Sequence, residues 1–110
     1  MTKKNRENPP DDGDYALITK ALEIISGKWR LSIILELNED IRRYSELSEQ
    51  LPAISEKMLA GELKALVTLG VVERKIYAQI PPRVEYKLTT KGRLALPILR
   101  QLREVGRLFT

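Results

Sequence analysis

Two short amphipathic helices with a tight turn between them constrain the fold more than any other feature of this chain. The first is predicted over 44–51, and Pro52 ends it because proline disfavours helical geometry in the preceding residue. Ser55 is a good N-cap for the second helix, and Gly70 is a natural C-cap for it. The apolar face of this helix is predicted to consist of Leu59, Leu63, Leu66 and Val67. Two short helices with so brief a connection are typical of a helix-turn-helix.

Two stretches of alternating side chains follow the second helix directly. Residues 71–77 and 83–88 alternate in polarity, which predicts two strands joined by the sequence AQIPP. A helix-turn-helix followed by a hairpin is the winged-helix arrangement, and the hairpin loop is the wing. Pro81 and Pro82 limit the flexibility of this loop. We expect Arg83 at its tip, placed to enter a minor groove or to contact a phosphate.

Helices are predicted on both sides of this unit. Residues 15–25 carry apolar side chains three and four positions apart, and 28–37 are apolar on most sides, as expected for a central buried helix. Residues 41–43 are a short extended link. A last helix is predicted over 91–109, capped by Thr89 or Thr90, with a kink or a restart at Pro97.

These predictions give one fold class. It is mainly α with a small β-hairpin (α+β), and it forms a winged helix-turn-helix domain over residues 15–110. Residues 1–14 are polar, contain Pro9 and Pro10, and are predicted to be a flexible arm.

Composition limits the functions that are open to the chain. It has no cysteine and no histidine, so a disulfide, a thiol-bound metal and the commonest acid–base catalyst are all excluded. No nucleophile–base pair is visible, so we expect no enzyme activity and no cofactor. The apolar runs are short and the N-terminus has no signal segment, which predicts a cytoplasmic protein without a membrane partner.

The positive charge is unevenly distributed. The net charge of the chain is +4, and residues 42–93 alone carry ten basic and six acidic side chains. This asymmetry favours a polyanionic partner such as double-stranded DNA, although an ordinary solvated surface explains the charge equally well.

The candidate DNA contacts come from the helix-turn-helix, the wing and the start of the second predicted helix. Basic side chains would hold phosphates, Ser55 and the free N–H groups after it would hold another, and the outward face of the helix that begins at Ser55 would enter the major groove. The predicted contacts are Lys28, Arg42, Arg43, Tyr44, Ser55, Glu56, Lys57, Ala60, Gly61, Lys64 and Arg83.

Several of these residues have a structural alternative. Tyr44 is equally suited to packing its helix onto the core, and Arg83 to an ion pair with Glu85 or a partner chain. Lys28, Arg42 and Lys64 are alternatively plain solvated charges. Glu62 would repel phosphates unless it faces a cytosine amine or an arginine.

Three stretches of the chain resemble the HxlR family of winged-helix transcription regulators, which are relatives of the MarR group. They are ALEIISGKWRLSIILEL, RRYSELSEQLPAISEKMLAGELKALVTLGVVER and PPRVEYKLTTKG, and the resemblance covers Ala16 to Gly106. It implies a homodimer on near-palindromic operator DNA, joined through the first and the C-terminal helices. Apolar residues that fit this role are Leu96, Leu99, Leu102, Val105 and Leu108.

The chain departs from the family pattern in two places. Many members carry a redox-sensing cysteine where this chain has Ala16, so thiol chemistry cannot be its signal. Members often have a more polar run where this chain has Ala60, Gly61 and Glu62.

The leading hypothesis is a homodimeric, sequence-specific DNA-binding transcriptional regulator with an inducer of unknown chemistry. The alternative is a winged-helix protein-interaction module with weak or no DNA binding.

Overall fold

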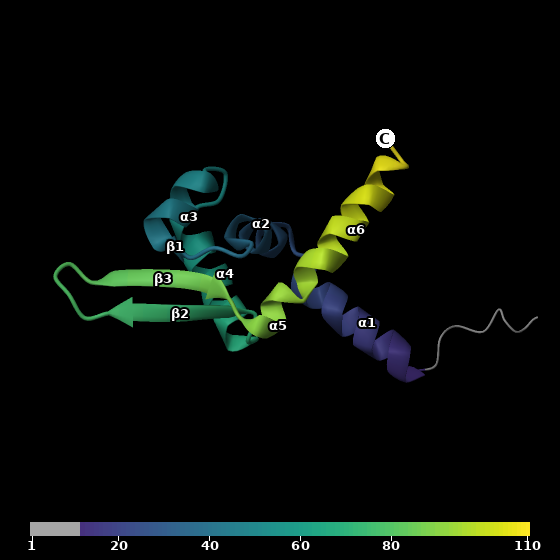
Figure 1. Cartoon of the computed structure of the whole chain (residues 1–110), viewed down its shortest axis with the longest axis horizontal. Helices are drawn as coiled ribbons and strands as arrows, with labels where there is room; N and C mark the ends of the chain where they lie inside the picture. The colour runs from purple at the N-terminus through teal and green to yellow at the C-terminus, as the bar shows by residue number, and fades with distance from the viewer. Residues whose placement is uncertain (1–11) are drawn as a thin grey trace, which may run out of the picture.

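The computed structural model describes residues 12–110. Its elements follow one another as α1 (Asp12–Ile25), α2 (Lys28–Leu37), β1 (Arg42–Arg43), α3 (Tyr44–Gln50), α4 (Glu56–Thr68), β2 (Val72–Tyr77), β3 (Arg83–Leu88), α5 (Thr90–Arg93) and α6 (Ala95–Arg107). The β2–β3 hairpin projects from one end, and α1 and α6 extend from the other (Figure 1). The predicted α+β winged-helix class is confirmed.

The core lies where α2 meets α3, α4 and the sheet. Ile33, Ile34 and Leu37 of α2 are completely buried, which confirms the prediction of a central buried helix. From α4, Leu59, Leu63 and Leu66 pack into the same cluster. Because these three residues recur at helical spacing, they turn the opposite face of α4 to solvent.

The sheet has three strands in the order β1-β3-β2, and both pairings are antiparallel. The predicted hairpin is present, with Arg74 opposite Tyr86 and Tyr77 opposite Arg83. The link expected over residues 41–43 is in part a strand, since Arg42 also lies opposite Tyr86. This third strand was not predicted, because two residues carry no alternation of their own.

The helix ends confirm the predicted local signals. The Ser55 Oγ accepts a hydrogen bond from the Met58 N–H at 3.1 Å. Gly70 adopts a left-handed φ of 79°, which glycine tolerates without steric cost. Thr89 caps α5 by accepting a hydrogen bond from the Gly92 N–H at 2.9 Å.

Two boundaries differ from the prediction. The first helix begins at Asp12, so residues 12–14 of the expected arm are helical, and residues 1–11 lie outside the described part. The last helix restarts, as predicted, but the break is at Leu94 and not at Pro97. Proline lacks an N–H and fits the first turn of a helix, so α6 begins just before it.

The apolar residues of α6 fall into two groups. Leu96 and Leu99 are buried in the core of this chain, so they are not free to form a dimer contact. Leu102, Val105 and Leu108 are exposed. Within residues 12–110, no helix has both the length and the apolar character needed to cross a bilayer.

Candidate nucleic-acid interface

The two helices of the helix-turn-helix are joined by polar contacts at their N-terminal ends. The Tyr44 hydroxyl donates a hydrogen bond of 3.0 Å to the Glu56 backbone carbonyl, and the Ser48 hydroxyl bonds the Glu56 carboxylate at 3.2 Å. Burial, reinforced by the neighbouring Glu56, raises the pKa of Tyr44 to about 12. Its only hydroxyl proton is therefore engaged in positioning α4, whereas the sequence analysis also considered it for a phosphate.

The outward face of α4 is the one that the sequence predicted. Glu56, Lys57, Ala60, Gly61 and Lys64 are all exposed. Lys57 and Lys64 form no ion pair within residues 12–110, so both ammonium groups are available to an anion. No atom lies within 4 Å of the position that a Cβ on Gly61 would occupy, so no packing contact within the described chain requires this glycine.

Glu62 does not belong to this outward face. Its carboxylate is half-buried and lies 2.9 Å from Nε of Arg30 on α2. This pair satisfies the condition set from the sequence, that Glu62 face an arginine. Sequence reasoning missed Arg30, since 32 positions separate the partners. The pair lines a groove of about 520 Å³ with Ser55, Lys57 and Gly61.

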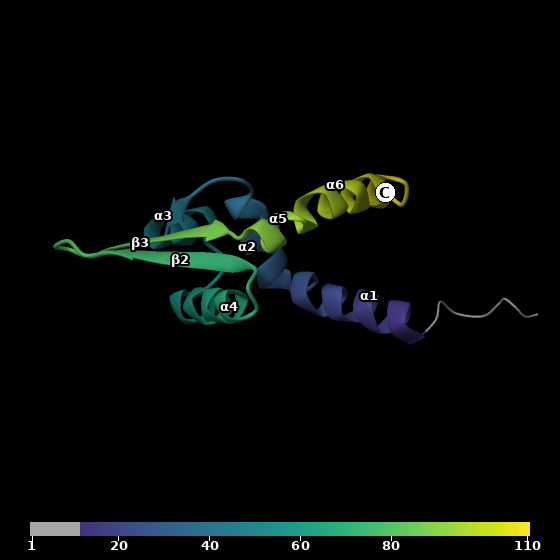
Figure 2. The ribbon, with the colours of Figure 1, turned by 60° about the horizontal axis from the view of Figure 1, so that its bottom comes forward.

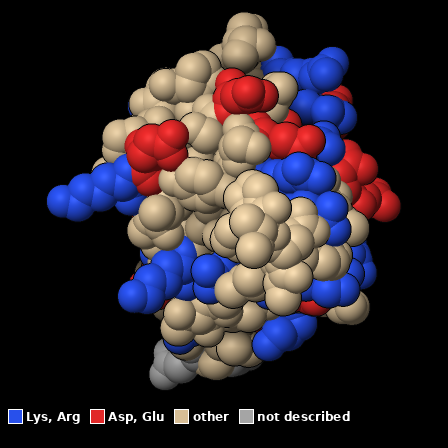
Figure 3. All heavy atoms as spheres, turned by 90° about the vertical axis from the view of Figure 1, so that its left-hand side faces the viewer, with Lys and Arg blue, Asp and Glu red and all other residues tan. Residues whose placement is uncertain are grey.

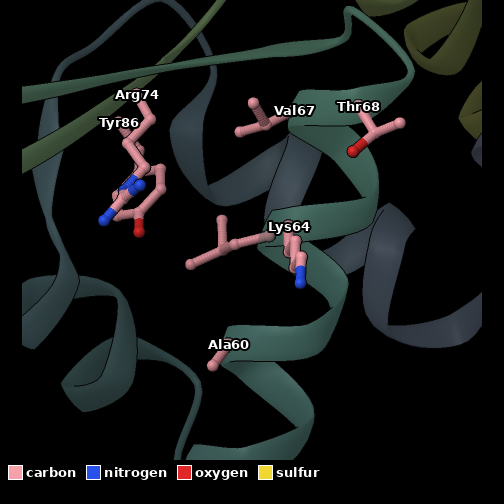
Figure 4. A pocket seen from close by; sticks show the side chains of 7 residues that line it. Ala60, Lys64, Val67, Thr68, Arg74 and Tyr86 are labelled. Carbon is pink, nitrogen blue, oxygen red and sulfur yellow. The ribbon is translucent and has the colours of Figure 1, made fainter.

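A second groove, of about 440 Å³, lies between α4 and the sheet. Figure 4 shows Ala60, Lys64, Val67 and Thr68 along α4, with Arg74 and Tyr86 facing them from the sheet. Arg74 is exposed and forms no ion pair within the described residues. The sequence analysis did not select Arg74, although its position in an alternating strand next to the helix-turn-helix was a signal.

The wing does not carry Arg83 at its tip. The loop spans residues 78–82, and Ile80 is completely exposed there. Arg83 is the first residue of β3, with its guanidinium 4.1 Å from the centre of the Tyr77 ring. Its Nε is buried and lies 3.3 Å from Oε2 of Glu85, an ion pair without a hydrogen bond. The predicted position is corrected, and the alternative of a Glu85 pair is present.

The two wing arginines lie on opposite faces of the hairpin. Residues that pair across an antiparallel sheet share a face, and successive residues alternate between faces. Arg74 shares a face with Tyr86, whereas Arg83 shares a face with Tyr77. Figure 2 shows α4 along one side of the hairpin, the side that Arg74 and Tyr86 line. Arg83 instead lines a groove of about 330 Å³ with Arg43 and Tyr44.

The remaining predicted cations differ in their surroundings. Arg43 is exposed and its guanidinium forms no ion pair within the described part of the chain. Arg42 is half-buried, 3.3 Å from Asp40 and 3.8 Å from Glu36. Such carboxylates repel phosphates, so the structure does not support Arg42 as a phosphate contact. The exposed Lys28 ammonium lies over the Trp29 ring at 4.7 Å.

The end of the molecule that carries the wing is mixed in charge. Viewed from that end, basic side chains surround an uncharged central area, and most acidic side chains lie in the upper half of the view (Figure 3). Within residues 12–110, no group of three or more His, Cys, Asp or Glu could hold a metal ion. This end is distinguished by the exposed outward face of α4 and by the cations near it that form no ion pair within residues 12–110, which are Lys57, Lys64 and Arg74.

Comparison with known proteins identifies the fold family. The family described as HxlR-like helix-turn-helix matches residues 24–110. An uncharacterized HTH-type transcriptional regulator of Methanothermobacter thermautotrophicus is 36% identical over 99 residues, which cover 90% of this chain and 76% of that protein. The uncharacterized HTH-type transcriptional regulator BH0655 of Halalkalibacterium halodurans is 48% identical over 86 residues, which cover 77% of this chain and 76% of that protein.

Solved structures agree with this family. The reduced form of the transcriptional regulator YodB from B. subtilis has a TM-score of 0.73 and 32% identity, covering 78% of this chain and 84% of that one. The redox regulator HypR in its oxidized form has a TM-score of 0.75 and 36% identity, covering 82% and 93%. The match spans most of the described elements, including the helix-turn-helix and the wing, and the chain belongs to the HxlR family of winged helix-turn-helix proteins.

Proposed function

We propose that this protein is a transcriptional regulator that binds double-stranded DNA as a homodimer. In this proposal α4 enters the major groove, and the wing lies at the adjacent minor groove or on the backbone. The observation that carries it is the outward face of α4, which is exposed on a winged-helix scaffold and presents unpaired Lys57 and Lys64. Regulators of the same family, with the same fold, support it.

The composition of this face favours backbone contacts over direct reading of bases. Ala60 and Gly61 have no polar side-chain atoms, so they permit close approach, and Ala60 can contact a thymine methyl. Lys57 is the one outward side chain of the first turn that can donate to a guanine edge. Binding that depends on phosphates releases counterions and falls steeply with salt.

The dimer is inferred from apolar surface that this chain does not cover. Leu17, Ile18 and Leu22 of α1 are 71%, 55% and 49% exposed, and Leu102 and Val105 of α6 are 50% and 49% exposed. The two helices extend away from the rest of the domain (Figure 2). A second copy of the chain would bury both faces, and a two-fold arrangement would present two copies of α4 to successive half-sites.

The regulatory signal is proposed only in part. HypR is described as a redox regulator, but this chain has no cysteine, so its signal does not use a thiol of its own. A small-molecule inducer stays a prediction. A cytoplasmic location is part of the same proposal, because a regulator must have access to the operator DNA that it binds.

Fluorescence anisotropy with duplexes selected from random DNA tests the proposal. The unaltered protein should bind with an affinity that falls as salt rises, and Lys57→Gln should weaken binding or change the preferred sequence. The matched control is Lys87→Gln, because Lys87 lies next to Glu73 at 4.0 Å on the sheet face away from α4. Absence of salt-dependent binding at low salt would favour the protein-interaction alternative.

A further inference from the structure

Each wall of the groove between α4 and the sheet carries one basic side chain that forms no ion pair within residues 12–110. Lys64 comes from α4, and Arg74 comes from the middle of β2, where it pairs with Tyr86 (Figure 4). Leu63 and Val67 form the apolar part of the lining. Because Arg74 projects from a paired strand and Lys64 from a capped helix, both Cα positions are held by regular structure.

The absence of acidic side chains distinguishes this groove from the opposite face of the hairpin, which carries Glu73 and Glu85. No acidic residue lines it, and neither Lys64 nor Arg74 forms an ion pair within residues 12–110. In contrast, Arg83 is paired with Glu85, and Lys87 lies at 4.0 Å from Glu73. The Tyr86 hydroxyl, which also faces this groove, donates no hydrogen bond within the described chain and is a third available donor.

The geometry of duplex DNA points to what the groove holds. The major and minor grooves of a duplex are separated by one sugar–phosphate strand. If α4 lies in the major groove and the wing at the adjacent minor groove, that strand must cross the space between α4 and the hairpin. The groove lined by Lys64 and Arg74 lies between these two elements.

We propose that this groove seats the DNA backbone strand between the major groove and the wing, with Arg74 and Lys64 contacting its phosphates. The inference rests on the proposed function and adds a contact residue, Arg74, that the sequence analysis did not select. An arginine can bond two phosphate oxygens at once, and Lys64 contributes a point charge from the other wall. Arg83, on the opposite face, is assigned to bracing the loop through Tyr77 and Glu85.

The test compares Arg74→Gln and Arg74→Lys with Lys87→Gln in anisotropy titrations at several salt concentrations. Each phosphate contact adds about 0.9 to the steepness of the plot of log affinity against log salt. Arg74→Gln should therefore lower this slope by about 1 per protomer and weaken binding to all duplexes alike. Arg74→Lys should keep most of the slope, and Lys87→Gln should keep all of it.

The outcomes separate this inference from the proposed function. If the unaltered protein shows salt-dependent binding and Arg74→Gln keeps the same slope, the groove does not seat the backbone. If Lys87→Gln lowers the slope as much as Arg74→Gln, the effect is general charge and the inference also fails. If the unaltered protein binds no duplex, both proposals are overturned. Arg74 is exposed, and equal melting temperatures of the variants would show that folding is unchanged.

Discussion

Gly92 is the position where a single added methyl group should damage this fold most. A Cβ built on Gly92 would lie 2.1 Å from the backbone oxygen of Val71 and 3.1 Å from its carbon. Both are backbone atoms, so no side chain can rotate away. The Val71 oxygen also accepts a hydrogen bond from the Thr89 N–H at 3.0 Å, and the Thr89 hydroxyl bonds Gly70 O at 2.6 Å. Gly92→Ala must therefore separate α5 from the start of the wing.

The magnitude follows from what that separation breaks. Relief of the clash needs a shift of about 1 Å, which takes a 3.0 Å hydrogen bond out of bonding range. Two or three hydrogen bonds at about 1 kcal/mol each, together with imperfect repacking, give a loss of about 2–4 kcal/mol. In a domain of this size such a loss lowers the melting temperature by roughly 10–20 °C. Gly92→Ala should show this loss in urea and thermal unfolding at matched protein concentration, since the proposed dimerisation would affect both.

Gly61→Ala is the matched control, because it makes the same substitution in open space. Nothing lies within 4 Å of the added methyl group, and Gly61 is inside α4. Alanine is favoured over glycine there by about 1 kcal/mol, so Gly61→Ala should raise stability. The reasoning is refuted if Gly92→Ala unfolds at the same urea concentration as the unaltered protein, or if both substitutions shift stability in the same direction.

Three further predictions concern Tyr44, the Arg30–Glu62 ion pair and the exposed apolar face of α6. Burial and Glu56 raise the pKa of Tyr44 to about 12, so the folded protein holds this proton more tightly than the unfolded chain, in which tyrosine titrates near 10. The stabilisation that Tyr44 contributes through its raised pKa is complete below pH 10 and is lost as the pH rises towards 12. The urea midpoint of Tyr44→Phe should therefore fall less steeply over this pH range than that of the unaltered protein. Arg30→Ala leaves the Glu62 carboxylate unpaired and should weaken DNA binding in anisotropy titrations. The added substitution Glu62→Gln should restore most of the affinity. No restoration would mean that Arg30 acts by another route. Leu102→Glu places a charge on the exposed apolar face of α6 and should yield monomers in sedimentation velocity without loss of helical circular dichroism, and an unchanged dimer would exclude this face from the interface.

Local signals predicted the helix-turn-helix well. Ser55 and Thr89 cap helices, and Gly70 closes α4, through bonds that span only three to five residues. Side-chain periodicity likewise predicted the burial of Leu59 and the exposure of Lys64 on α4, because one turn of helix relates such positions directly. The restart of the last helix was predicted at Pro97, and the structure places it three residues earlier, at Leu94.

The arrangement of charges could not be predicted in the same way. Arg42, Arg74 and Arg83 are equally basic in the sequence, but Glu36 and Asp40 neutralise the first, and Glu85 pairs with the third. Strand register then places Arg74 and Arg83 on opposite faces of the hairpin. The strand Arg42–Arg43 was missed because it forms only against the free edge of β3.

From the sequence alone came the order of the helices and the hairpin, the caps, the inward and outward faces of α4 and the absence of cysteine chemistry. These depend on composition and on interactions within a few residues along the chain. The tertiary structure decided which cations stay unpaired, that Arg30 holds Glu62, and that Lys64 and Arg74 share one groove. Charge pairing acts through space, so its outcome depends on residues that only folding brings together.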